Sequence, residues 1–216
     1  GLLKLLKERN LDPGYFKPVG QHYQRYKNKN IDEDAVLIHK VFSIKDMPYY
    51  LSPIAIERNF TRKFIFDPKV EPLEKEILEC SKKLSKKHYF VVVEGTGHAG
   101  VGSCFGLSNA RVAELLDAKV VIVTSGGIGK PLDEIALSLA LYRHHNVEVV
   151  GVILNKVLQE KYQKVTKTVR QGLKNMGTRL VGSIPYEPDL TFFTMGQLAG
   201  EMKLGVFSGK ENLKNR

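Results

Sequence analysis

The sequence has few of the features that mark secreted, zinc-stabilised or membrane-spanning proteins. Its 216 residues include two cysteines, Cys80 and Cys104, with no CxxC pair and no histidine at ligand spacing beside either. This argues against a disulfide framework and a structural zinc site. No apolar run approaches the roughly 20 residues that a helix needs to cross a bilayer, and the opening GLLKLLKERN lacks the core of a signal peptide. We therefore expect a cytoplasmic protein without a membrane partner.

The net charge of +10 is the strongest compositional bias. Clustered lysines and arginines can bind nucleic acid through its phosphates. Here the lysines are spread over helix-like stretches such as 74–87 and 156–174, without the interleaved aromatic residues of a single-strand-binding groove. We expect a small molecule, and not nucleic acid, as the binding partner.

Hydrophobic residues make up 43% of the chain, enough for a sizeable core. Five segments rich in β-branched or aromatic residues predict strands, several of them apolar at successive positions, as in strands covered on both faces. Amphipathic helical patterns lie between them. The predicted strands are 14–19, 89–94, 119–124, 147–154 and 178–184, and the predicted helices are 2–8, 33–42, 72–86, 108–116, 131–144 and 159–176. This alternation predicts an α/β fold with a doubly wound, mostly parallel sheet and helices on both faces.

The length is typical of one large α/β domain, which we expect to span residues 1–204. No internal repeat or low-complexity stretch interrupts it. Residues 205–216 are polar and lack a periodic pattern, so we expect a tail or the start of a linker there.

Ligands of open parallel sheets bind at the carboxyl ends of the strands, so the residues just after each predicted strand are the candidate site residues. Lys17 lies where the first predicted strand gives way to Pro18 and Gly20. Two interpretations are equally supported by this residue alone. It is either a solvated charge beside a turn proline or a ligand for a phosphate or carboxylate.

The most informative passage is Glu94 with the glycine-rich loop GTGHAGVG directly after it. A carboxylate at the end of a buried strand is poorly solvated and favours a nearby cation. The backbone of Gly95, Thr96 and Gly97 could approach an anion closely, because glycine adds no side chain. A loop that needs several positive φ angles would explain the glycines but not Glu94, so we favour a functional site. His98 is a weaker signal, since lone loop histidines are commonly structural or solvated.

Two further strand ends carry polar residues. The segment SGGIGK at 125–130 resembles a dinucleotide fingerprint only loosely, and a bare GGxG is a weak signal. Asn155 closes the strand VVGVIL, and its amide offers both a donor and an acceptor to the edge of a base. A structural and a functional role are equally compatible with Asn155 alone.

Taken in order, these passages resemble the dethiobiotin synthetase family of P-loop NTPases. The resemblance extends to the dethiobiotin-synthetase-like domains of some phosphotransacetylases and of cobyrinic acid a,c-diamide synthases. It covers nearly the whole chain and depends on the order and spacing of the motifs more than on any one of them. The matching segments are YFKPVG at 15–20, DEDA at 32–35, SPIA at 52–55, EGTG at 94–97, Asn155 and GSIP at 182–185.

The resemblance implies a role for each candidate residue. Asp34 and Glu94 would hold Mg²⁺, and Lys17 would contact phosphate and substrate as the catalytic residue. Asn155 would select the adenine of ATP, and the strand end at Pro185 would close over the base. The family further implies a homodimer with its sites near the interface.

The sequence departs from the family pattern in two places. No GxxxxGK[ST] occurs anywhere, so the first strand and the P-loop of the family are absent from this sequence, and residues 2–8 resemble the later part of the helix that should come after them. We expect the chain by itself to bind nucleotide weakly and to be inactive. His98 stands where dethiobiotin synthetases continue with glycine, so the substrate pocket could differ.

Two functions are compatible with this pattern. The first is ATP- and Mg²⁺-dependent ligase or phosphoryl-transfer chemistry on a carboxylate or carbamate. The second is a non-catalytic, nucleotide-sensing domain of a phosphotransacetylase-like protein. The C-terminal segment TMGQLAGEMK resembles the segment that leads into a further domain in those relatives, which favours them over a stand-alone synthetase.

Overall fold

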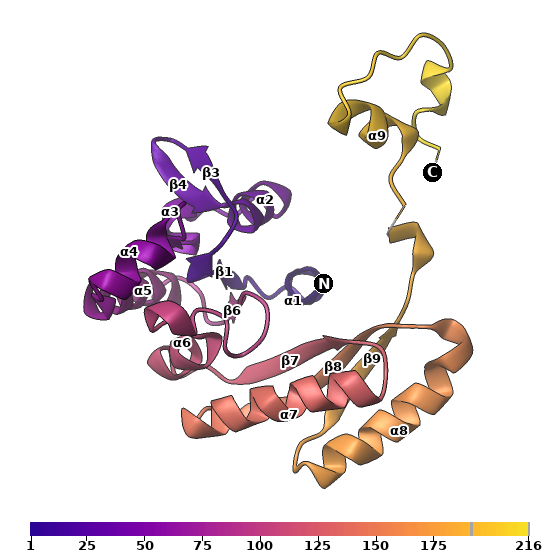
Figure 1. Cartoon of the computed structure of the whole chain (residues 1–216). Helices are drawn as coiled ribbons and strands as arrows, with labels where there is room; N and C mark the ends of the chain where they lie inside the picture. Colours follow the sequence, from indigo (N-terminus) through magenta and orange to yellow (C-terminus); the bar gives the residue numbers. More distant parts are fainter. Residues whose placement is uncertain (191, 216) are drawn as a thin grey trace. The chain divides into compact units, whose positions relative to one another are not determined.

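The computed structural model describes residues 1–190 and 192–215 and has an α/β fold built from helices and parallel strands (Figure 1). The chain divides into two compact units. The first comprises Gly1–Val120 with Ala136–Val150, and the second comprises Val121–Ile135 with Gly151–Arg216. The predicted domain over residues 1–204 stays a prediction.

The first unit contains most of the elements. In chain order these are α1 (Leu2–Glu8), β1 (Gly14–Phe16), β2 (Val19–Gly20), β3 (Tyr23–Tyr26), β4 (Lys29–Asp32), α2 (Glu33–Val41), α3 (Pro48–Leu51), β5 (Ile54–Ala55), α4 (Phe60–Phe66), α5 (Val70–Ser85), β6 (Val91–Val93), the 3-10 turn η1 (Ser103–Phe105) and α6 (Asn109–Leu115). The first predicted strand is divided into β1 and β2, because Pro18 has no backbone N–H to donate to a sheet.

Strand pairing in the first unit joins segments that are distant in the sequence. β1 pairs in parallel with β6, with Tyr15 opposite Val92, and β2 pairs in parallel with β5. β3 and β4 form an antiparallel hairpin that the sequence did not predict. Its turn residues, Lys27 and Asn28, both have positive φ, which matches the twist of the flanking strands although neither is glycine.

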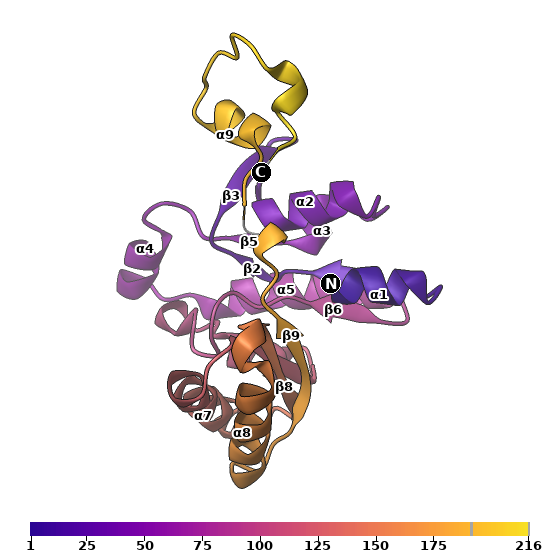
Figure 2. The ribbon, with the colours of Figure 1, turned by 90° about the vertical axis from the view of Figure 1, so that its right-hand side faces the viewer.

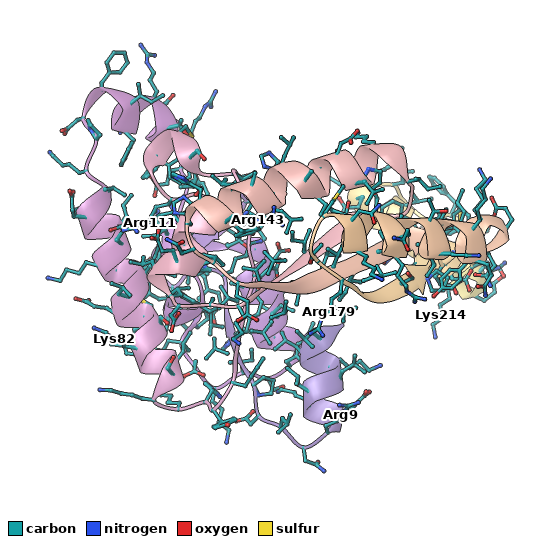
Figure 3. All side chains as sticks on the ribbon, turned by 90° about the horizontal axis from the view of Figure 1, so that it is seen from below. Arg9, Lys82, Arg111, Arg143, Arg179 and Lys214 are labelled. Atoms are coloured by element: carbon teal, nitrogen blue, oxygen red, sulfur yellow. The ribbon has the colours of Figure 1, made fainter. Side chains whose placement is uncertain are left out.

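The core of the first unit forms around β1, in which Tyr15 and Phe16 are almost completely buried. The amphipathic helix α5 covers this strand, as its sequence pattern predicted, and buries Ile77 and Leu84. Arg111, labelled in Figure 3, joins α6 to α5, because its Nε donates to Glu74 Oε1 at 2.8 Å.

The second unit centres on a three-stranded sheet in the order β7 (Val120–Ser125), β8 (Val149–Val157), β9 (Leu180–Pro185). β8 and β9 run parallel. The boundary between the units passes through β7, β8 and α7 (Gly129–His144). The remaining elements are the 3-10 turn η2 (Gln159–Lys161), α8 (Tyr162–Asn175), the 3-10 turn η3 (Pro188–Leu190), α9 (Met195–Glu201) and the 3-10 turn η4 (Lys210–Asn212).

Helix α8 packs against β9, and Tyr162 donates from its hydroxyl to Ser183 O at 2.9 Å. β7 differs from the prediction of a strand covered on both faces. Val121 and Val123 are exposed, and Val123 keeps 61% of its accessible surface. Side chains alternate between the two faces of a strand, so one face of β7 is buried less than its apolar sequence predicts.

The C-terminal residues fold back on α9. The amide of Gly196 donates to Leu213 O at 2.8 Å, and that of Met195 donates to Asn215 O at 2.9 Å. No helix in the described part of the chain combines the length and the apolar character needed to cross a membrane.

Candidate functional site

Lys17 lies at the centre of a cluster of acidic side chains. It comes directly after β1, and its backbone amide donates to Leu51 O at 2.7 Å. The residue is only 5% exposed, so it is not the solvated charge that was one of the two interpretations. Its Nζ lies 3.1 Å from Asp32 Oδ1 and 3.6 Å from Glu94 Oε1, and it also donates to Asp34 Oδ2. Separate segments therefore bring their carboxylates to one ammonium group.

Asp32 and Asp34 enter the cluster from the junction of β4 and α2. Asp32 is the N-cap of α2 and accepts a hydrogen bond from the Asp34 amide at 3.0 Å, which satisfies a free donor at the helix start. Asp32 is 1% exposed, and its second oxygen, Oδ2, has no hydrogen-bond partner among the described residues. A Cβ at Gly20 would lie 2.4 Å from this oxygen, so the backbone of β2 approaches it closely. Asp32 was not among the predicted site residues.

Glu94 enters from the end of β6, where its amide donates to Phe16 O at 2.8 Å. Tyr15 donates from its hydroxyl to Glu94 Oε2 at 2.8 Å. Burial raises the pKa of Tyr15, and the adjacent charge of Glu94 raises it further, so the phenol stays protonated and remains a donor. Tyr15 thus fixes one oxygen of Glu94 while the other faces Lys17.

The cluster around Lys17 contains more negative than positive charge. Burial lowers the pKa of Lys17, but hydrogen bonds to Asp34 and Asp32 and the attraction of Asp32 and Glu94 outweigh it, so the pKa is raised overall. Lys17 is therefore cationic. One ammonium group faces three carboxylate groups, which leaves acceptor capacity for a further cation.

The glycine-rich loop after Glu94 is held by Asn109, the first residue of α6. Asn109 Nδ2 donates to Thr96 O at 2.8 Å and to His98 O at 2.7 Å, and its Oδ1 accepts from the Thr96 amide at 3.1 Å. A Cβ at Gly95 would lie 2.9 Å from Asn109 Oδ1, so the loop needs glycine there. Neither composition nor spacing pointed to Asn109, because its partners lie 11 and 13 residues away.

The predicted contacts of the loop with a nucleotide are not equally available. The Thr96 amide donates to Asn109 and its hydroxyl donates to Val19 O at 3.0 Å, so both donors of Thr96 are used within the protein. Gly97 has a φ of +67°, in the left-handed region that favours glycine. The exposed His98 accepts a hydrogen bond from the Gly100 amide at its Nδ1.

Asn155 and Pro185 belong to the second unit. They lie near the ends of the neighbouring parallel strands β8 and β9, where Val157 pairs with Pro185. Asn155 O accepts from the Gly126 amide at 2.6 Å, which brings the SGGIGK segment to the end of β8. The Asn155 side chain accepts from the Lys156 amide at 2.9 Å through Oδ1. Within residues 1–190 and 192–215, its Nδ2 has no hydrogen-bond partner.

The α/β fold, with parallel strands and helices, is consistent with a P-loop NTPase-like class. The chain matches the AAA domain family over residues 1–194 and belongs to it. This family match, together with the relatives below, confirms the resemblance to the dethiobiotin synthetase-like branch of P-loop NTPases.

Curated relatives fall into two groups. The phosphate acetyltransferase of Pseudomonas putida is 27% identical over 88% of this chain, and that of Synechocystis sp. is 23% identical over all of it. These alignments cover 27% and 31% of those proteins, so the chain spans about a third or less of their length. The ATP-dependent dethiobiotin synthetase BioD of Nitrosopumilus maritimus is 24% identical over 92% of this chain and 86% of its own length.

Proposed function

We propose that this chain is a dethiobiotin-synthetase-like domain that binds ATP with Mg²⁺ and, together with a P-loop, takes part in phosphoryl transfer to a carboxylate or carbamate. The observation that supports it best is the convergence of Asp34 and Glu94 on Lys17 from separate elements. The relatives named ATP-dependent dethiobiotin synthetase support the use of ATP.

The residues of the cluster fit a magnesium ion. Within residues 1–190 and 192–215, no set of three or more His, Cys, Asp or Glu side chains is arranged to hold a metal by itself. Mg²⁺, however, is usually held by one or two carboxylates together with phosphate oxygens and water. The carboxylates of Asp34 and Glu94 supply that number of ligands, and the unpartnered Oδ2 of Asp32 adds negative potential nearby. The bound ion would neutralise charge on the phosphates of ATP.

Each residue then has a defined task. Lys17 would contact phosphate and substrate once a bound cation offsets the carboxylates that surround it, and Tyr15 holds Glu94 in place. The backbone of Gly95 and Gly97 would approach the phosphates. Asn155 and Pro185, which belong to the second unit, stay the predicted contacts of adenine. Such a site acts by positioning and charge neutralisation, because phosphoryl transfer needs little covalent chemistry from the protein.

Manganese broadening tests the metal site directly. Mn²⁺ is paramagnetic and broadens the NMR signals of nearby amides, so weak binding is detectable on the chain itself. With ATP and Mn²⁺, the amides of residues 34 and 94–97 should broaden. Asp34→Asn and Glu94→Gln should each remove this effect, whereas Glu79→Gln, an exposed acid of α5, should not. Equal broadening in all three variants would contradict the assignment.

A second candidate is a nucleotide sensor without catalysis. It is favoured by the phosphate acetyltransferase relatives, of which this chain covers less than a third. Turnover separates the two candidates. In a protein that carries the P-loop as well as this chain, consumption of ATP in the presence of a diamine and bicarbonate supports the enzyme, whereas binding of Mg²⁺-ATP without consumption supports the sensor. We also propose a homodimer in the cytoplasm, which sedimentation and fractionation would test.

A further inference from the structure

A groove lies along α4 and the beginning of α5, within the first unit. It has a volume of about 930 Å³ and is lined by residues between Asn59 and Leu73. Figures 1 and 2 both draw α4 at the outer edge of this unit. No residue of the Lys17 cluster lines the groove, so it is a feature separate from the proposed nucleotide site.

The apolar part of the groove is aromatic. Phe60 and Phe64 stack with ring centroids 6.2 Å apart, and each meets the buried ring of Phe105 edge-on, at 5.5 and 6.4 Å. These contacts anchor one side of α4 to the core. Phe66 is 82% exposed and lines the groove with Leu73. A helix that leaves such a ring in water presents apolar surface that a ligand could cover.

The charged part of the groove is cationic. Its lining includes Arg62, Lys63 and Lys69, with Asp67 as its acid. Lys69 Nζ lies 2.8 Å from Asp67 Oδ2, so these two charges neutralise each other. Arg62 and Lys63 have no ion-pair partner within the described residues. The groove therefore combines an aromatic surface with two cations that are available to a ligand.

We propose that the α4 groove binds a small amphipathic anion, with an aromatic or acyl body and one carboxylate, sulfonate or phosphate group. Its volume lies within the roughly 300 to 1,000 Å³ of small-molecule sites. The body of the ligand covers Phe66 and Leu73, and its anionic group pairs with Arg62 and Lys63. A neutral apolar compound leaves both cations unpaired, and a fully hydrophilic anion leaves the aromatic surface in water. Both bind less tightly than the amphipathic anion.

A pair of dyes tests this selectivity. Anilinonaphthalene sulfonate has an apolar ring system with one anionic group, and phenylnaphthylamine has the same rings without the charge. Titrations monitored in the amide NMR spectrum of the full chain locate each dye. We expect the sulfonate to shift the amides of residues 59–73 saturably and the neutral dye to shift them more weakly.

Two double variants that lower the net charge equally distinguish binding in the groove from a general effect of net charge. The double variant Arg62→Gln/Lys63→Gln should weaken sulfonate binding about five- to tenfold, the effect of two exposed ion pairs, and leave the neutral dye nearly unchanged. Lys164→Gln/Lys167→Gln on α8, with the same change in net charge, should affect neither. Phe66→Ala should weaken both dyes.

Three results would overturn the proposal. The first is a set of shifts at β7 to β9 with none at residues 59–73. The second is an equal loss of affinity in the two double variants. The third is equal binding of the two dyes at the groove. None of these readouts depends on ATP, so a failure here is distinguishable from a failure of the proposed nucleotide site.

Discussion

Asn109 and Thr96 are joined by a reciprocal pair of hydrogen bonds. The Thr96 amide donates to Asn109 Oδ1, and Asn109 Nδ2 donates to Thr96 O. The side-chain amide of Asn109 thus donates one hydrogen bond to the Thr96 backbone and accepts one from it, as the backbone of a neighbouring β-strand would. One residue of α6 therefore fixes the backbone of Thr96 in the loop after Glu94.

Removing that side chain should release the loop. We expect Asn109→Ala to lower the free energy of unfolding by about 1 to 2 kcal/mol, because partly buried loop groups lose their partners. Hydrogen exchange of the Thr96 amide should become faster. Ser108→Ala is the matched control, since it removes the N-cap bond to the Arg111 amide and costs about 1 kcal/mol without touching the loop. Unchanged Thr96 exchange in Asn109→Ala would contradict this role.

Lys17→Met should destabilise the fold, because the buried carboxylate of Asp32 loses its cation. Breaking a buried pair costs about 3 to 5 kcal/mol, and we expect about 2 to 4 kcal/mol because Asp34 and Glu94 are partly exposed and screened by solvent. Urea unfolding measures the change. The double variant Lys17→Met/Asp32→Asn should recover part of the loss, whereas strictly additive effects would show that the two residues do not interact.

Asp46 should make stability depend on pH in the acid range. Burial would raise its pKa, but hydrogen bonds from Lys87 and His88 outweigh burial and lower it below the usual range. A carboxyl whose pKa is lower in the folded state contributes stability that is present above its unfolded pKa of about 4 and is lost as pH falls through the folded pKa.

Urea unfolding between pH 6 and pH 2 measures this contribution of Asp46. Asp46→Asn should be less stable at neutral pH and should lose less stability on acidification than the unsubstituted protein. Asp67→Asn is a control, since Asp67 is exposed and pairs with an exposed lysine. Parallel pH profiles for Asp46→Asn and the unsubstituted protein would refute the expectation.

Gly102→Ala should destabilise the loop that ends at α6. Gly102 has a φ of +98°, and a Cβ there would lie 2.1 Å from Leu107 O, which is backbone and cannot rotate away. We expect a loss of about 2 kcal/mol or more in thermal or urea unfolding. Gly200→Ala in α9 has open space around its Cβ and should be neutral or slightly stabilising. If Gly102→Ala and Gly200→Ala changed the free energy of unfolding equally, the steric clash with Leu107 O would not be the cause.

The sequence predicted the elements whose patterns are long and periodic. The helices α5 and α8 and the strands β8 and β9 appear within a few residues of their predicted bounds, because apolar residues recur at helical spacing in the two helices and the two strands are rich in β-branched residues. The hairpin β3–β4 was missed, because its turn uses Lys27 and Asn28 in place of the glycine that usually signals positive φ. Helix α4 was missed because it buries no residue completely.

Lys17 and Glu94 could be grouped from the sequence, because the carboxyl ends of neighbouring parallel strands meet at one edge of a sheet, whereas Asp34 was assigned from the family resemblance alone. Asp32 and Asn109 could not. The position of Asp32 in the site depends on its capping of α2 and on the β3–β4 hairpin. The position of Asn109 depends on the path of the loop that leads from Glu94 to α6. Such contacts depend on tertiary packing, which no local pattern of residues encodes. The roles of Asn155 and Pro185 stay predictions.

The close approach of Gly20 to Asp32 has a consequence for how this chain can vary. A side chain at position 20 would occupy the space of the Asp32 carboxylate, so the two positions are not free to change separately. A Cβ at position 20 would also lie 2.4 Å from Asp32 Cβ, so alanine there becomes acceptable only with glycine at position 32, which would remove the carboxylate that caps α2 and a charge beside Lys17. Homologues that share the Lys17 cluster should therefore keep both residues or replace both together.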